Sequence, residues 1–252
     1  MCARPLGPMA EPPRRPPSLI ALGRTVYGLH PAVTWSILLF PIVSMLGFGL
    51  ALYYPPAYQR TIRMLAEDRQ VENTTVYAYL VALIPALIMA ARMWARRRPL
   101  AVIGFVWLAL LCFGLAGEEI AWGQRILHFH PPALFKSNVQ HETTIHNFPI
   151  FQLFSAWYTL VLGAAGLIAI LTHSRWRREA SGVPSLIVTH GWVIVLMAGC
   201  DDFNQWFFFD LKFSTEIGRL QELVEMLFAF ALMVGIWLAL RRDTRQRSAT
   251  AP

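Results

Sequence analysis

Long apolar runs alternate with short polar segments along the whole chain. Six runs reach the roughly 20 residues that an α-helix needs to cross a hydrocarbon core about 30 Å thick. The predicted transmembrane helices are Val33–Tyr54, Val76–Trp94, Leu100–Ile120, Phe151–Thr172, Leu186–Phe209 and Leu220–Leu240. Pro41 and Pro85 fall inside the first two, where neighbouring groups in a bundle can satisfy the carbonyl that a proline frees. The pattern predicts an all-α, polytopic membrane bundle of about six transmembrane helices.

The basic residues predict the orientation of this bundle. Most of the 22 Lys and Arg residues lie before the first predicted helix, after the second, after the fourth and after the last. Because cytoplasmic loops retain Lys and Arg, both termini are predicted to be cytoplasmic. The predicted organisation is a partly disordered cytoplasmic tail at 1–32, a transmembrane domain at 33–240 with a polar outer loop at 121–150, and a cytoplasmic tail at 241–252.

Composition agrees with a membrane protein and argues against one class of partner. Hydrophobic residues make up 56% of the 252 residues and charged residues only 15%, outside the range of most soluble domains. The net charge of +7 comes from short clusters between apolar runs. These clusters form no continuous basic stripe, so we expect no nucleic-acid partner. The lipid bilayer is the expected partner, together with other membrane proteins if the chain is an assembly subunit.

The acidic residues show the opposite bias to the basic ones. Of the 15 Asp and Glu residues, all but Glu11, Glu179 and Asp243 fall on the predicted outer side or at the outer ends of helices. The positive-inside rule places little constraint on Asp and Glu, so this bias needs another cause. Carboxylates in a low-dielectric setting must be compensated, and a cation shared with histidine is one means of doing so. We therefore expect several of these acids to converge on one polar outer site.

The third predicted helix ends in two adjacent carboxylates, Glu118 and Glu119. At the lip of a membrane helix they need a partner, a proton, a metal or water. Helical spacings of four and seven would place Glu118, Trp122 and Arg125 on one face. One interpretation is an interfacial anchor, with Trp122 in the aromatic belt and Arg125 as counter-ion. The alternative gives Glu118 or Glu119 the role of general base.

The outer loop that follows contains a dense polar segment, from Asn138 to Asn147. If this segment is helical, Glu142 and His146 share a face, at a spacing that suits two ligands of one metal. The segment is not a zincin motif, because His141 and His146 are five residues apart instead of four. The alternative interpretation is a polar interfacial segment that hydrogen-bonds neighbouring loops.

Two further acidic pairs lie near the predicted outer ends of the last two helices. Asp201 and Asp202 are in the fifth helix, and Glu222 and Glu225 are three residues apart in the sixth. His190 lies about 16 Å inward of Asp201 at ~1.5 Å rise per residue, too far to share its ligands. We interpret His190 as a structural histidine, with a place in a proton relay as the alternative.

Together these residues define a candidate site on the extracytoplasmic face, with Glu118 or Glu119 as the catalytic base. We expect a divalent zinc, manganese or iron ion as cofactor, with ligands drawn from Glu142, His146, Asp201, Asp202, Glu222 and Glu225. The residues expected to contact substrate are Trp122, Gln124, Arg125, Asn138, Gln140 and Asn147.

Two segments of the chain carry a resemblance to known proteins. Gly117-Glu118-Glu119-x-x-Trp122-Gly123-Gln124-Arg125 and Asn138-x-Gln140-x-Glu142-x-x-x-His146-Asn147 resemble a pattern in bacterial multi-pass membrane proteins of unassigned function. That resemblance covers the middle of the chain and implies no activity. A more remote likeness is to alkaline ceramidase-like membrane hydrolases, which use carboxylate and histidine ligands around zinc. Their spaced histidine motifs near the last helix have no clear match here, so this likeness is an analogy.

Three functions compete on this evidence. The first is a metal-dependent hydrolase or transferase acting on a lipid or lipid-linked substrate, with Trp122 and Trp206 lining the access route. The second is an ion-coupled transporter, which is weakened because the ionisable residues gather at one face while transporter sites lie near the midplane. The third is a non-catalytic assembly or scaffold subunit that binds another membrane protein through its outer loop.

Overall fold

The computed structural model describes residues 18–66, 69–135, 137–138, 141–150, 160–161, 163–168, 171, 186–207 and 214–250. For residues 125, 200–207 and 214–218 it describes the backbone alone. All regular structure in this part of the chain is helical. The main helices are α1 (Leu19–Tyr27), α2 (Pro31–Tyr53), α3 (Pro55–Met64), α4 (Gln70–Ala95), α5 (Pro99–Glu119), α10 (Val188–Phe207) and α11 (Ser214–Thr250). Three short turns follow α5, namely η1 (Ala121–Gly123), α6 (Gln124–Leu127) and η2 (Ala133–Phe135).

Four helices in the described part of the chain are long and apolar enough to cross a membrane. They are α2, α4, α5 and the Arg219–Thr250 portion of α11. The prediction of a helical membrane protein is confirmed to this extent. The fifth predicted helix corresponds to α10, whose apolar stretch Val188–Gly199 is shorter. The fourth, Phe151–Thr172, lies largely outside the described residues.

Some helices lie where the hydropathy pattern predicts none. α1 forms within the segment predicted to be a partly disordered tail, and α3 forms in a segment with no predicted element. α11 continues to Thr250, through the region predicted to be the C-terminal tail. Arg241 explains part of this extension, because its side chain donates hydrogen bonds to the carbonyls of Tyr27 (2.7 Å) and Gly28 (3.1 Å). The extended end of α11 is therefore tied to the end of α1.

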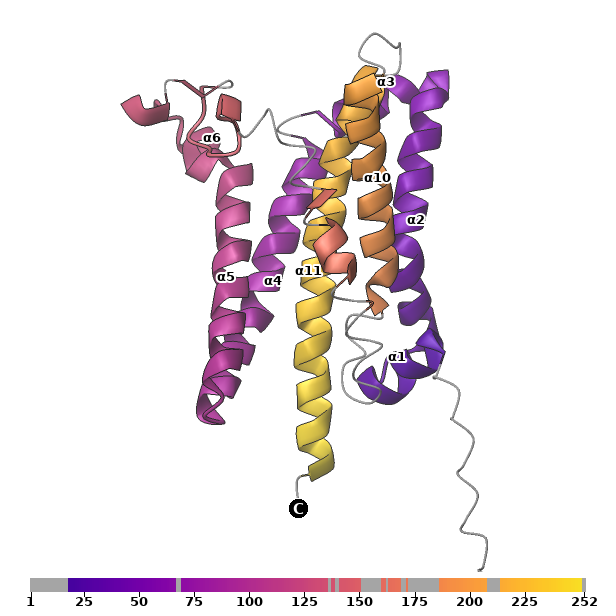
Figure 1. Cartoon of the computed structure of the whole chain (residues 1–252), viewed down its shortest axis with the longest axis vertical. Coiled ribbons are helices and arrows are strands. Elements are labelled where there is room, and N and C mark those ends of the chain that lie inside the picture. Colours follow the sequence, from indigo (N-terminus) through magenta and orange to yellow (C-terminus); the bar gives the residue numbers. More distant parts are fainter. Residues whose placement is uncertain are drawn as a thin grey trace, which may run out of the picture.

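The long helices lie side by side in the order α5, α4, α11, α10 and α2 (Figure 1). α4 makes the two most extensive interfaces, with α5 and with α11. One buried cluster in these interfaces is made largely of small side chains from α4 and α5: Ala78, Ala82, Ala86, Ala109, Cys112 and Ala116. Small side chains let membrane helices approach closely, which increases their van der Waals contact.

Large apolar side chains point away from the bundle. Leu50 of α2 is 70% exposed and Trp107 of α5 is 67% exposed. A water-soluble protein rarely presents so much continuous apolar surface. Lipid tails solvate such side chains, so their exposure on the surface of the bundle supports the membrane assignment.

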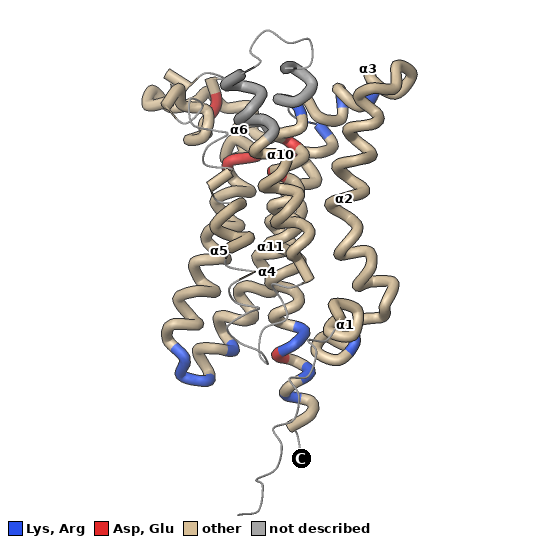
Figure 2. Tube along the Cα trace, turned by 45° about the vertical axis from the view of Figure 1, so that its right-hand side comes forward, with Lys and Arg blue, Asp and Glu red and all other residues tan. Residues whose placement is uncertain are grey.

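The charged residues gather at the two ends of the helices (Figure 2). At one end Asp243 of α11, only 5% exposed, forms ion pairs with Arg92 (3.0 Å), Arg96 (2.6 Å) and Arg247 (3.2 Å). We call this the arginine-rich end. The opposite end contains Glu118 at the close of α5, and we call it the acidic end.

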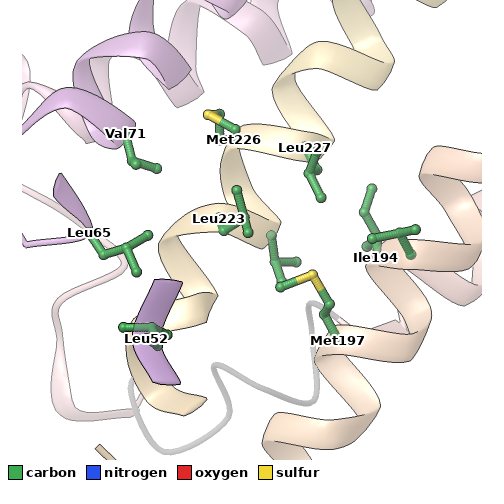
Figure 3. Close-up of a cluster of buried hydrophobic side chains, with 10 residues drawn as sticks. Leu52, Leu65, Val71, Ile194, Met197, Leu223, Met226 and Leu227 are labelled. Atoms are coloured by element: carbon green, nitrogen blue, oxygen red, sulfur yellow. The ribbon is translucent and has the colours of Figure 1, made fainter. Parts of the chain in front are cut away.

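A core of buried apolar side chains near the acidic end joins four helices (Figure 3). It includes Leu52 of α2, Val71 of α4, Ile194 and Met197 of α10, and Leu223, Met226 and Leu227 of α11. This core fixes the starts of α4 and α11 relative to each other, and both helices carry acidic side chains close to it.

We predict that Ala82→Leu destabilises the bundle while Val81→Leu does not. Ala82 is fully buried in the α4–α5 cluster, so the larger side chain overpacks it at a cost of about 1–3 kcal/mol. Val81 precedes it on α4 and is 53% exposed. Thermal unfolding in detergent should show a lower midpoint for Ala82→Leu alone. Equal midpoints for the two variants would contradict the packing described here.

Candidate functional site

A tight reversal of the backbone follows α5. Ala121 and Trp122 both have left-handed backbone angles (φ 47° and 52°), and Gly123 follows with φ 86°. Two consecutive non-glycine residues in this region store conformational strain, which persists only where other contacts hold the chain. The sequence expectation that Glu118, Trp122 and Arg125 share one helical face is therefore wrong, because the helix ends at Glu119.

Trp122 nevertheless reaches Glu118 through this reversal. Its indole Nε1 donates a hydrogen bond to Glu118 Oε1 at 2.6 Å. The ring lies against Gly117, where an added Cβ would approach it to 2.9 Å. Gly117 therefore provides the space that lets the indole fold back onto the end of α5.

The second carboxylate oxygen of Glu118 holds the outer loop. Glu118 Oε2 accepts hydrogen bonds from the backbone amides of Ile145 (2.6 Å) and His146 (3.1 Å). It also lies 3.2 Å from the ring nitrogen Nδ1 of His146. With the indole bond, one carboxylate makes four polar contacts, three of them to a segment 27 or more residues away. Both oxygens of the predicted catalytic base are thus engaged, Oε1 by the Trp122 indole and Oε2 by the loop.

Three residues that were predicted to contact substrate also hold the loop. Gln124 Oε1 accepts from the amide and the hydroxyl of Thr143, both at 2.7 Å. Asn138, 1% exposed, donates to the carbonyl of Thr144 at 2.7 Å. Asn147, 2% exposed, donates to Glu142 Oε2 at 3.4 Å. In these contacts the polar side chains of the segment and of Gln124 hold the turns of the loop.

In the segment from Asn138 to Asn147, the described residues form bends and turns and are not helical. The condition for placing Glu142 and His146 on one helical face is therefore not met. The two side chains still lie close enough to interact electrostatically. Glu142 and His146 are brought together by the turns between them and by the hydrogen bonds from the loop to Glu118, and not by a shared helical face.

His146 lies at the centre of a group of carboxylates from three parts of the fold. Its side chain is 43% exposed. The negative charges of Glu118 (α5), Glu142 (loop) and Glu225 (α11) act on it. Glu225 in turn accepts a hydrogen bond from Gln221 at 3.3 Å and is close enough to Glu72 of α4 for their charges to interact.

Glu72 is a member of this group that sequence reasoning missed. It is 7% exposed and lies in the first turn of α4. The available signal was an acidic residue at the outer start of a predicted helix, the same signal that singled out Glu222 and Glu225. The predicted convergence of acids thus extends to a fourth element, α4.

The surroundings of His146 favour its charged form. Burial opposes protonation, but the hydrogen bond to Glu118 and the charges of Glu225, Glu118 and Glu142 outweigh it and raise the pKa of the imidazole above its ordinary 6.5. The histidine therefore acts as the cation that compensates the surrounding acids.

Other predicted site residues are not placed in this group. Glu119 and Glu222 are not among the side chains that contact His146 or act on its charge, and both have interactions of their own. Gln140 and the side chains of Arg125, Asp201 and Asp202 lie outside the described residues. Among the described side chains, no three His, Cys, Asp or Glu groups are close enough to hold a metal ion. The catalytic, substrate and metal roles stay predictions.

A second feature lies deeper in the fold. His190 of α10 is 1% exposed, and neither of its ring nitrogens has a hydrogen-bond partner among the described residues. Its ring lies 6.2 Å from that of Phe40 of α2, centroid to centroid. A buried polar group without a partner is costly, so this position suits a bound water molecule.

Comparison with known proteins gives no relative: no protein-family model, curated protein or solved structure matches the chain.

We predict that Glu118→Gln loosens the outer loop. The variant keeps the size of the side chain but replaces one acceptor oxygen by an amide that cannot accept, and it loses charge-assisted bonds worth about 1.5–3 kcal/mol each. Hydrogen exchange of the Ile145 and His146 amides should accelerate about tenfold or more.

Trp122→Phe is the matched control for this measurement. It removes only the indole bond to Oε1 and leaves both amide bonds to Oε2. Exchange at 145 and 146 should stay close to wild type in this variant. Unchanged exchange in Glu118→Gln would show that the carboxylate does not hold the loop.

We also predict a pH dependence of stability centred on His146. Because the folded-state pKa is raised above 6.5, the stabilisation by the charged imidazole is complete below about pH 6.5 and is lost as the pH rises through the raised pKa. Thermal unfolding measured between about pH 6 and 9 should show a midpoint that falls with pH. His146→Gln should flatten this dependence, and an equally steep fall in that variant would contradict the assignment.

Proposed function

We propose that the chain is a multi-pass membrane enzyme, a hydrolase or transferase acting on the polar part of a lipid or lipid-linked substrate at its acidic end. The observation that carries this proposal is the carboxylate–imidazole pair, Glu118 Oε2 to His146 Nδ1 at 3.2 Å. A carboxylate on one ring nitrogen fixes the orientation of a histidine and directs proton exchange to the other nitrogen.

The roles of the side chains in this proposal follow from their positions. A water molecule attacks the carbonyl or phosphoryl centre and transfers a proton to Glu225, while the His146 imidazolium donates a proton to the leaving oxygen, or to the leaving nitrogen of an amide. The proton then returns from Glu225 to His146, with which it interacts electrostatically. In a transferase an acceptor hydroxyl takes the place of water. Glu118 is a positioning residue in this scheme, because its oxygens hold the loop and the ring.

The surroundings of the site support an amphipathic substrate. The arm that follows α5 exposes apolar side chains, with Ile126 66% exposed, Leu127 74% and Leu134 76%. Figure 1 shows α6 projecting sideways beyond the end of α5. Apolar side chains beside a polar site at the ends of membrane helices match the depth at which lipid headgroups meet their tails.

The membrane setting is part of the same proposal. We infer six transmembrane helices, cytoplasmic termini and a site on the extracytoplasmic face of a bacterial inner membrane. The arginine-rich end supports this orientation, because the positive-inside rule assigns it to the cytoplasm. A divalent metal bound through Glu142 and His146, with Asp201 or Asp202, is the metal-dependent form of the proposal.

Two other functions compete with the enzyme. An ion-coupled carrier is favoured by His190, which lies buried in α10 away from the acidic end. A non-catalytic scaffold would use the same exposed arm to bind another membrane protein. Lipid turnover distinguishes the enzyme from both.

We predict that the purified protein releases a product from at least one of three lipids offered in phosphatidylcholine vesicles: a phospholipid ester, a ceramide amide and a prenyl diphosphate. His146→Gln should lower the rate about 100-fold or more, the typical size of a lost acid–base group. Glu118→Gln should lower the rate less and shift its pH profile. Product is measured by chromatography of fluorescently labelled lipids.

His128→Gln is the control, since His128 is an exposed histidine at the end of α6. The same preparations are analysed for zinc, manganese and iron. A stoichiometric metal that His146→Ala and Glu142→Ala both remove would establish the metal-dependent mechanism in place of the metal-free one. Folded wild-type protein that leaves all three lipids intact would reject the enzyme and favour the carrier and the scaffold.

A further inference from the structure

A groove runs between α4 and α11, away from the acidic end. Its volume is about 460 Å³, and all eight lining residues are apolar: Val81, Ile84, Pro85, Ile88, Met233, Val234, Trp237 and Leu240. The outer parts of the wall face the surroundings of the bundle, with Ile84 60% exposed and Trp237 40% exposed. The groove is therefore open on the side that faces the bilayer.

The length of the groove suits one hydrocarbon chain. On each helix the lining residues span seven steps, or about 10 Å at ~1.5 Å rise per residue. One leaflet contributes about 15 Å to the hydrocarbon core. The groove thus follows much of one leaflet, in the half of the bundle nearer the arginine-rich end.

The groove ends at a basic cluster. Arg92 lies one turn beyond Ile88 on α4, and its Nη1 donates to Thr244 Oγ1 of α11 at 2.8 Å, which links the two helices just beyond the groove. Arg241 lies one turn beyond Trp237 on α11, and its guanidinium carbon is 5.2 Å from the centre of the Trp237 ring. The mouth of the groove is therefore bordered by guanidinium groups of both helices.

The ion pairs in this cluster neutralise only part of the positive charge of its guanidinium groups. In the described part of the chain, Asp243 is the single carboxylate paired with Arg92, Arg96 and Arg247. The side chains of Arg92 and Arg96 remain 26% and 34% exposed. An anionic group placed there gains charge-assisted hydrogen bonds that arginine makes well with phosphate.

We infer that this groove and cluster form a binding site for an anionic phospholipid of the adjacent leaflet. One acyl chain occupies the groove along α4 and α11, and the headgroup phosphate lies against Arg92, Arg96 and Arg241. This site is separate from the proposed catalytic centre and does not depend on it.

Charge decides between the lipid and the main alternative occupant, a second copy of the chain. A copy packed in the same orientation would bring its own arginine-rich end beside this one and would add positive charge to positive charge. A lipid phosphate in the same place is instead attracted to the arginines. Each arginine near a membrane surface contributes about 1 kcal/mol to binding of anionic lipid, which is about fivefold in affinity.

Native mass spectrometry of the full chain in detergent tests the inference. The probes are phosphatidylglycerol and phosphatidylcholine with identical acyl chains, added at equal concentration. We expect phosphatidylglycerol to bind at least about fivefold more tightly. Arg96→Gln should reduce this preference severalfold, and Ile84→Trp, which fills the groove at an exposed position, should weaken both lipids.

Two variants serve as matched controls. Arg60→Gln removes an exposed arginine of α3 at the acidic end, and Leu87→Trp enlarges a 52% exposed residue of α4 outside the groove. Both should bind lipid as wild type does. Equal binding of the two lipids, or an equal loss of preference in Arg60→Gln, would overturn the inference. A dimer without bound lipid that Ile84→Trp dissociates would assign the groove to a second copy instead.

Discussion

The outer part of the structure depends on the charge of Glu118 at the end of α5. A carboxylate at the lip of an apolar helix is costly unless its charge is compensated. An irregular loop has the complementary problem, because its backbone amides need acceptors. Glu118 meets both needs at once by accepting from the amides of Ile145 and His146. The anchored loop can then use Gln124 and Asn138 to hold its remaining turns.

The position of His146 follows from this anchor. The same carboxylate oxygen binds the backbone amide of His146 and faces its ring, so both the chain and the side chain are fixed by one group. Once placed there, the imidazole is close to Glu225, and Glu225 is close to Glu72. The charges of Glu118 from α5 and Glu225 from α11 thus both act on one residue of the loop, and α4 joins this group through the interaction of Glu72 with Glu225.

The sequence predicts the long apolar helices of this structure, but it predicts the positions of the site residues only in part. The long apolar helices follow from hydropathy, because burial in lipid depends on length and composition alone. Topology places Glu118 and Glu225 at similar depth, since both lie near helix ends on the same side of the bundle, but depth alone does not bring them beside Glu142 and His146 of the loop.

The reversal at Ala121 and Trp122 could not be read from the sequence, because these residues have no propensity for left-handed backbone and tertiary contacts impose it. For the same reason helical periodicity failed from Glu119 onward. α3 and the extension of α11 were missed because hydropathy predicts only segments that cross the membrane.

At each end of the bundle, one central group is surrounded by several groups of the opposite charge, and the signs are reversed between the two ends. At the arginine-rich end a single buried carboxylate, Asp243, lies among three guanidinium groups. At the acidic end a single imidazole, His146, lies among three carboxylates whose charges act on it. Each central group compensates only part of the charge around it, so each end retains an excess of its own sign. At the arginine-rich end, that excess favours the anionic headgroup that we infer there. The apolar helices between them keep the two excess charges apart, because moving either one inward would carry the full cost of desolvation.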